Sequence, residues 1–290
     1  MKCALRGSGN EVAVAPAVIL VFHAARNPVV RSEPIPETPP TPPALPEPTS
    51  LAARLVNVYV SPGDVFDEVA ASPRDNGNWV LPLILSAVMS VVFCFAVFSQ
   101  ENVVRNVLDT QEKEIRKQVD AGKMPKEAAV GFNEAAGKYG SVIMIAFGSL
   151  FAIIGCIAML FIVALVLMLV GRFAFGTDVA YLKMAEVSGL AAMITLLGSI
   201  AKMFVVIATG RIEIGVSPAA LVENFNPGNH THALLGILDL SMFWYVAVLA
   251  CGLSRVCGVK WWRAAAWLFS LWFLIAASMA AMAFLGARAS

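Results

Sequence analysis

Charged residues are scarce in this chain of 290 residues: they make up 14%, against about a quarter in an average soluble domain. Common catalytic motifs are also missing, since there is no HExxH, GxSxG, phosphate-binding glycine loop or GxGxxG. The formal net charge is only +1, which provides no broad basic field for nucleic acid. We therefore expect a protein that is not an enzyme, binds no nucleic acid and needs no cofactor.

Cysteine is sparse too. Three of the five cysteines, Cys94, Cys156 and Cys251, lie inside apolar runs and are expected to pack as small hydrophobic residues. The chain contains no CxxC pair, so the pattern predicts neither a disulfide framework nor a metal site built on cysteine.

Long apolar runs are what the chain has in excess, because 58% of its residues are hydrophobic. Runs of about 20 apolar residues can cross a bilayer, where only a helix satisfies the backbone hydrogen bonds internally. The sequence thus predicts an all-α, polytopic membrane helix bundle with five transmembrane helices. The predicted spans are residues 80–98, 142–170, 187–209, 233–253 and 264–285.

A polar segment, residues 100–139, separates the first two predicted spans and holds seven basic and seven acidic residues. Its apolar residues recur near one helical face, and Ala121-Gly-Lys-Met-Pro125 interrupts the pattern. We expect a helical hairpin that stands off the membrane, with a short second helix over Lys126–Ala136.

The residues before the first span divide into two parts. Residues 1–50 include eight prolines between Pro34 and Pro48 and are predicted to form a disordered tail. Residues 51–79 are predicted to be an amphipathic, membrane-proximal segment, with a helix over Leu51–Val60 and a second helix capped by Ser61. The apolar face of the second helix, which contains Phe66, is expected to lie on the bilayer surface or under the first span.

Two ionisable residues fall inside predicted spans. Lys202 and Asp239 lie at matched depth on consecutive spans, so we expect them to form a pair. Three interpretations remain open: a structural bridge, a substrate or ion site, and a Lys202 that extends alone to the interface. Nearby, His230-Thr-His232 offers two imidazoles, but with no obvious third ligand we predict an exposed loop and not a metal site.

Orientation rests on a small bias in the distribution of basic residues. Short links carrying Arg172, Arg255 and Lys260 favour a cytoplasmic amino terminus, which places Ser290 outside. Small residues at four-residue spacing in the last span, such as Ala276 and Ala280, permit close helix packing. Such packing within the bundle and the formation of a homo-oligomer are both open.

Three stretches resemble the Yip (Ypt-interacting protein) family of five-span membrane proteins. They are Val58-Tyr-Val-Ser-Pro-Gly-Asp-Val-Phe66 with Trp79-Val-Leu-Pro-Leu83, then Gly171-Arg-Phe-Ala-Phe-Gly-Thr177, and finally Leu235-Gly-Ile-Leu-Asp-Leu-Ser-Met-Phe-Trp244. Leu238, Asp239 and Trp244 fit the family's Leu-Asp-x-Phe-x-x-Trp pattern, whereas Ser241 stands where that pattern has Phe. The likeness extends over residues 51–285, and the polar hairpin is similar to that of bacterial members.

The resemblance implies a function in membrane organisation. Eukaryotic members act in vesicle traffic and bind small GTPases, whereas bacterial relatives share the membrane domain without an assigned activity. We expect a scaffold or partner-recruiting element in a bacterial inner membrane, in contact with the lipid bilayer and with protein partners. The alternative is a small transporter or permease subunit that uses Lys202 and Asp239.

Overall fold

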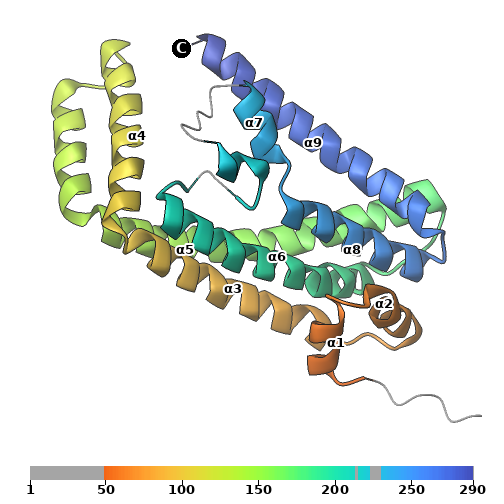
Figure 1. Ribbon diagram of the computed structural model, residues 1–290. Coiled ribbons are helices and arrows are strands. Elements are labelled where there is room, and N and C mark those ends of the chain that lie inside the picture. Colours follow the sequence, from red (N-terminus) through yellow and green to blue (C-terminus); the bar gives the residue numbers. More distant parts are fainter. Residues whose placement is uncertain (1–48, 213–214, 223–229, 290) are drawn as a thin grey trace, which may run out of the picture. The chain divides into compact units, whose positions relative to one another are not determined.

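The computed structural model describes residues 49–212, 215–222 and 230–289. The chain divides into two units, 1–46 and 47–290, and every described residue belongs to the second. The predicted disordered tail therefore lies almost wholly outside the described residues. Regular structure in the described part of the chain is entirely helical, which confirms the predicted fold class. Figure 1 shows the helices α1 (Leu51–Asn57), α2 (Pro62–Ala71), α3 (Gly77–Phe98), α4 (Glu101–Asp120), α5 (Lys126–Phe175), α6 (Tyr181–Thr209), α7 (His230–Ile237), α8 (Leu240–Cys257) and α9 (Trp261–Ala289).

Four helices in the described residues are long and apolar enough to cross a membrane: α3, α5, α6 and α8. They coincide with the first four predicted spans. The predicted fifth span falls within α9, whose 29 residues include an uncharged stretch from Ala264 to Leu285. The multi-pass helical architecture is thus confirmed, and the count of five is approximate.

The core of the membrane part is built around α6, which packs against α3, α5 and α8. Gly189 permits the closest approach: a Cβ atom at this position would lie 2.7 Å from the carbonyl oxygen of Asn78 in α3. Leu190 and Ile194 continue the same part of α6 and are fully buried. Close backbone contact at a small residue is how helices associate tightly in lipid.

The polar hairpin differs from the prediction in one respect. Its turn is where it was expected, since α4 ends at Asp120 and Gly122 adopts a φ of 68°, which glycine tolerates best. The second arm, however, is not a separate short helix, because α5 runs unbroken for 50 residues from Lys126 to Phe175. Residues 137–141 contain two glycines but no proline, and therefore keep every backbone N–H donor that the helix needs.

The fourth predicted span is not a continuous helix from residue 233. α7 ends at Ile237, Leu238 and Asp239 are not helical, and α8 begins at Leu240. The Asp239 carboxylate caps α8 by accepting a hydrogen bond from the Ser241 backbone N–H at 2.9 Å. An acidic residue therefore starts a new helix here, as aspartate commonly does at an N-cap.

The membrane-proximal segment forms two helices that pack on the bundle. Pro62 occupies the first turn of α2, but the predicted cap is wrong, because the Ser61 side chain makes no capping hydrogen bond. Phe66 is fully buried, and it approaches Gly252 of α8 so closely that a Cβ there would lie 3.2 Å from its ring. The apolar face of α2 thus covers α8 and α6; it does not lie on the bilayer surface. We call α1 and α2 together the cap.

Candidate functional site

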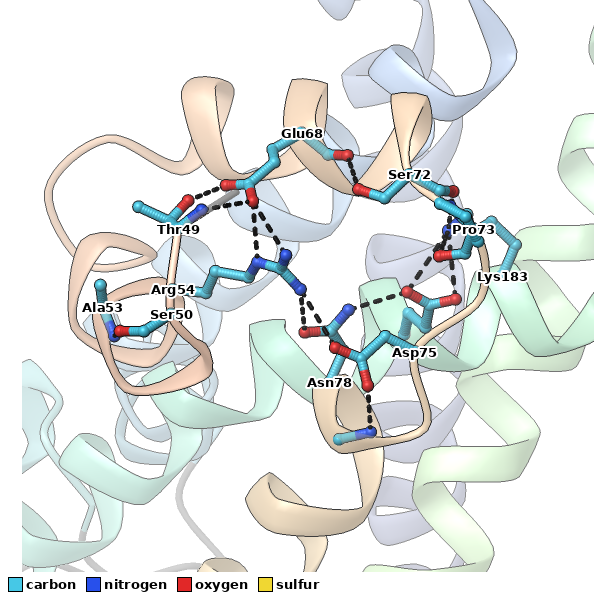
Figure 2. Close-up of polar contacts among 12 residues, drawn as sticks. Thr49, Ser50, Ala53, Arg54, Glu68, Ser72, Pro73, Asp75, Asn78 and Lys183 are labelled. Carbon is cyan, nitrogen blue, oxygen red and sulfur yellow. Dashed lines mark hydrogen bonds and ion pairs between the residues drawn. The ribbon is translucent and has the colours of Figure 1, made fainter. Parts of the chain in front are cut away.

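A buried polar cluster lies where the cap meets the first turns of α3 and α6. It consists of Arg54, Glu68, Asp75, Asn78, Lys183 and Glu186, and we refer to it as the Arg54 cluster (Figure 2). These residues come from α1, α2, the α2–α3 link, α3 and α6, so the cluster forms only when the whole cap is docked.

Arg54 is the centre of the cluster on the cap side and is only 6% exposed. Its Nη2 donates to Glu68 Oε1 at 2.8 Å, and its Nη1 donates to Asp75 Oδ2 at 3.2 Å. The same Nη1 also donates to Asn78 Oδ1 at 3.2 Å. One guanidinium therefore joins three elements, a use for which its planar fork of five N–H donors is well suited.

Glu186 is the matching centre on the α6 side and is 1% exposed. Its Oε2 accepts a hydrogen bond from Asn78 Nδ2 at 2.8 Å, and its Oε1 lies 3.2 Å from Lys183 Nζ. Lys183 Nζ also donates to the Ser72 carbonyl oxygen at 3.1 Å, which ties the end of α2 to α6. Asn78 thus bridges the two charged centres through one amide group. Figure 2 shows its hydrogen bond to Arg54.

The cluster is built to satisfy its charges. In the described part of the chain, Arg54 and Glu186 are the charged residues that are buried, and each has a partner of opposite charge and a hydrogen-bond partner within reach. An isolated charge here would be strongly unfavourable, so the cluster stabilises the docked cap only as a complete set. With two cations and three carboxylates, its formal charge is −1.

Two further contacts fix the cap to the bundle. The Tyr59 hydroxyl donates to the Met193 carbonyl oxygen at 2.7 Å, and its ring lies 6.0 Å from that of Trp244. Burial raises the pKa of Tyr59 above the ordinary 10.0, so the phenol keeps its donor proton. On the other side, Arg255 Nη1 lies 3.2 Å from Asp67 Oδ2, an exposed pair that joins the end of α8 to α2.

The structure does not bring Lys202 and Asp239 together. Lys202 is half-buried in α6, and no ion pair among the described residues includes it. The Asp239 carboxylate is instead engaged locally, accepting from the Ser241 hydroxyl at 2.5 Å as well as from its backbone. Its second oxygen lies so close to Gly215 that a Cβ there would be 2.6 Å away.

The side chain of His230 lies outside the described part of the structure, so only one histidine of the pair can be placed. His232 lies in the first turn of α7. Within the stretches that the structure describes, no group of three His, Cys, Asp or Glu side chains is arranged to hold a metal ion.

Sequence reasoning missed both buried centres of the cluster. The third span was predicted to start at residue 187, one position after Glu186. A signal was available in the i, i+3 spacing of Lys183 and Glu186, which places both on one helical face. For Arg54 there was none, since its partners lie 14 to 24 residues away on other elements.

The family model for the Yip1 domain matches residues 56–282. This match covers well over half of the chain. The chain belongs to the Yip1-domain family. No curated protein and no solved structure matches it significantly.

The Yip1 domain contains α2 through most of α9, and so it includes the first four predicted spans and most of the fifth. Asn78, Lys183 and Glu186 lie inside the matched region, whereas Arg54 lies two residues before it. The Arg54 cluster thus extends from just before the Yip1 domain into its interior. The family's Leu-Asp pair, Leu238 and Asp239, marks the break between α7 and α8.

Proposed function

We propose that this Yip1-domain protein is a non-enzymatic membrane scaffold that recruits a protein partner through its cap. The observation that carries the proposal is the attachment of the cap. The Arg54 cluster and Tyr59 fix two short helices rigidly to the end of the membrane bundle. Rigid presentation reduces the ordering entropy that a partner has to overcome on binding.

The outer surface of the cap supports the same proposal. Val56 and Val60 are 64% and 85% exposed, and both precede the first apolar span in the chain. Exposed apolar side chains beside a polar surface are a common feature of protein interaction sites. The buried charges of the Arg54 cluster are directed at one another, so their arrangement fits a structural role better than a reactive one.

We further propose that the cap lies on the cytoplasmic side of a bacterial inner membrane. The ends of α5 and α8 and the starts of α6 and α9 lie at the cap end of the bundle, because Lys183 and Arg255 contact α2 and the residues beside it. Arg172 in the last turn of α5, Lys260 in the α8–α9 link and Arg263 in the first turn of α9 all lie at that end, and basic residues beside short links favour the cytoplasmic side.

Transport through Lys202 and Asp239 has no observation in its favour. A cavity of about 350 Å³ lies between α3, α5, α6 and α8, and it is lined by Ser90, Thr195 and Tyr245 among others. Neither Lys202 nor Asp239 lines this cavity. We therefore propose the scaffold function alone.

The test is site-directed photo-crosslinking in native membranes. A photoreactive amino acid at Val60 is expected to give a discrete protein adduct, whereas one at Ile84, an exposed position on the apolar α3, is expected to give lipid adducts only. Combining the Val60 probe with Arg54→Gln should lower the yield of the protein adduct, because the cap loses the ion pairs of Arg54 that attach it to the bundle. The absence of any protein adduct at Val60 and Val56, together with solute flux in liposomes, would refute the scaffold function.

A further inference from the structure

An open apolar groove lies between the last turns of α5 and the first turns of α9. It has a volume of about 350 Å³, within the range of about 300–1,000 Å³ typical of ligand sites. Val166, Leu169 and Phe173 of α5 form one wall, and Trp267 and Leu271 of α9 form the other. The groove exists because α9 packs chiefly on α8, which leaves its other face separated from α5.

The groove has a cationic end. Arg263, Trp267 and Leu271 follow one another at four-residue spacing and so form a single stripe along α9. The Arg263 guanidinium carbon lies 5.6 Å from the centroid of the Phe175 ring, at the end of α5. This contact places a positive charge where the apolar walls of the groove finish.

A second cation lies beside the first. Lys260 immediately precedes α9, and its carbonyl oxygen accepts a hydrogen bond from the Arg263 N–H at 3.0 Å. Both side chains are exposed, and neither takes part in an ion pair within the described ranges. The first turn of α9 contains no acidic residue, so two cations adjoin the positive end of a long helix.

This arrangement favours a bound anion. Free backbone N–H groups at a helix start and two basic side chains together suit a phosphate group. Trp261 and Trp262 are half-exposed in the same turn, at the level where tryptophans meet lipid headgroups. A ligand with a phosphate and an aliphatic chain would match both the charged end and the apolar walls.

We propose that this groove binds one anionic phospholipid of the surrounding bilayer. One acyl chain lies between α5 and α9, and the phosphate is held by Arg263, Lys260 and the start of α9. Charge complementarity selects the occupant, since a zwitterionic lipid would bring its own cation toward the two basic residues. The site is at the cap end of the bundle but shares no residue with the Arg54 cluster, and it does not depend on the proposed partner.

The test uses the purified full-length chain and native mass spectrometry, with phosphatidylglycerol and phosphatidylcholine of identical acyl chains. The wild type is expected to retain one phosphatidylglycerol in preference to phosphatidylcholine. The double variant Lys260→Gln/Arg263→Gln should lose about 30-fold of that preference, at about 1 kcal/mol for each basic residue. Arg116→Gln/Lys117→Gln in α4 removes the same charge at exposed positions and should leave the preference unchanged.

Two further arms separate the parts of the site. Leu271→Trp, which fills the groove, should reduce retention of both lipids, whereas inorganic phosphate alone should not compete with the bound lipid. Equal retention of the two lipids by the wild type would overturn the proposal. So would an unchanged preference in the Lys260/Arg263 variant, or full retention by Leu271→Trp, provided that thermal unfolding shows both variants folded.

Discussion

At the scale of single residues, the most consequential side chain is Glu186. It is buried near the start of α6, and its two oxygens bind an amide of α3 and the ammonium group of Lys183. Lys183 in turn reaches the Ser72 carbonyl oxygen at the end of α2. The Glu186 carboxylate therefore connects the membrane bundle with both helices of the cap, through Asn78 to α1 and through Lys183 to the end of α2.

We predict that Glu186→Ala lowers the free energy of unfolding by about 3–5 kcal/mol, the usual consequence of removing one partner of a buried ion pair. The loss arises because the buried Asn78 amide loses its acceptor and Lys183 loses the carboxylate that balances its charge. Thermal unfolding in detergent measures it. Glu101→Ala is the matched control, since Glu101 also pairs with a basic residue but is 83% exposed, and it should change stability little. Equal effects of the two substitutions would contradict the structural role of Glu186.

The residue scale is also where sequence reasoning reached least far. Lys202 and Asp239 attracted attention because charge inside an apolar run is conspicuous, but depth along a helix does not determine which face a side chain occupies. The Asp239 carboxylate found a local partner in Ser241. Asn78 and Glu186 meet although 108 residues separate them, and only the packing of α3 on α6 brings them together.

At the scale of elements, the crossing of α3 and α6 decides whether the site can form. The backbones approach closely at Gly189, one turn after Glu186, which places Asn78 within reach of that carboxylate. A wider crossing would separate the amide from both charged centres. The geometry of the polar cluster thus depends on the absence of a single methyl group.

We predict that Gly189→Ala destabilises the protein by about 1–3 kcal/mol, the typical effect of overpacking a core. The added Cβ would lie 2.7 Å from the Asn78 carbonyl oxygen, so α3 has to shift. Gly155→Ala in α5 is the control, because nothing lies within 4 Å of a Cβ there, and alanine is the better helix former. Thermal unfolding of the two variants gives the comparison, and a Gly189→Ala protein as stable as Gly155→Ala would disprove the close crossing.

Elements were predicted well where apolar length alone defines them. α3 and α6 end at the predicted residues, 98 and 209, where a polar segment follows α3 and the left-handed Gly210 caps α6. Prediction failed where helix boundaries do not coincide with the boundaries between polar and apolar sequence. α5 passes from a polar into an apolar stretch without changing structure, and α8 begins inside an apolar run because Asp239 can cap it.

At the scale of the whole molecule, the spans determine on which side of the membrane each turn lies. Between the α4–α5 turn and the α8–α9 turn the chain passes through α5, α6 and α8, all candidate spans. An odd number of crossings places the two turns on opposite sides. This relation holds whether or not α9 crosses as well.

We predict that Lys123→Cys and Lys260→Cys are labelled from opposite sides of the membrane, in a background without the five native cysteines. With the cap in the cytoplasm, an impermeant thiol reagent should modify Lys123→Cys in intact cells and Lys260→Cys only after permeabilisation. Both residues lie in exposed turns, so accessibility is not limited by packing. Labelling of both from the same side would contradict three crossings between them, and the reversed pattern would contradict the orientation.

The unbroken course of α5 has a mechanical consequence. Followed along its axis, the helix is about 75 Å long, more than twice the hydrocarbon thickness of about 30 Å. Figure 1 shows that α5 changes direction between the polar arm and the second span, although no loop separates them. A molecule that pulls on the tip of the arm would therefore transmit force to the second span through continuous helical hydrogen bonds, and it would act at the bend before it acted on the apolar segment.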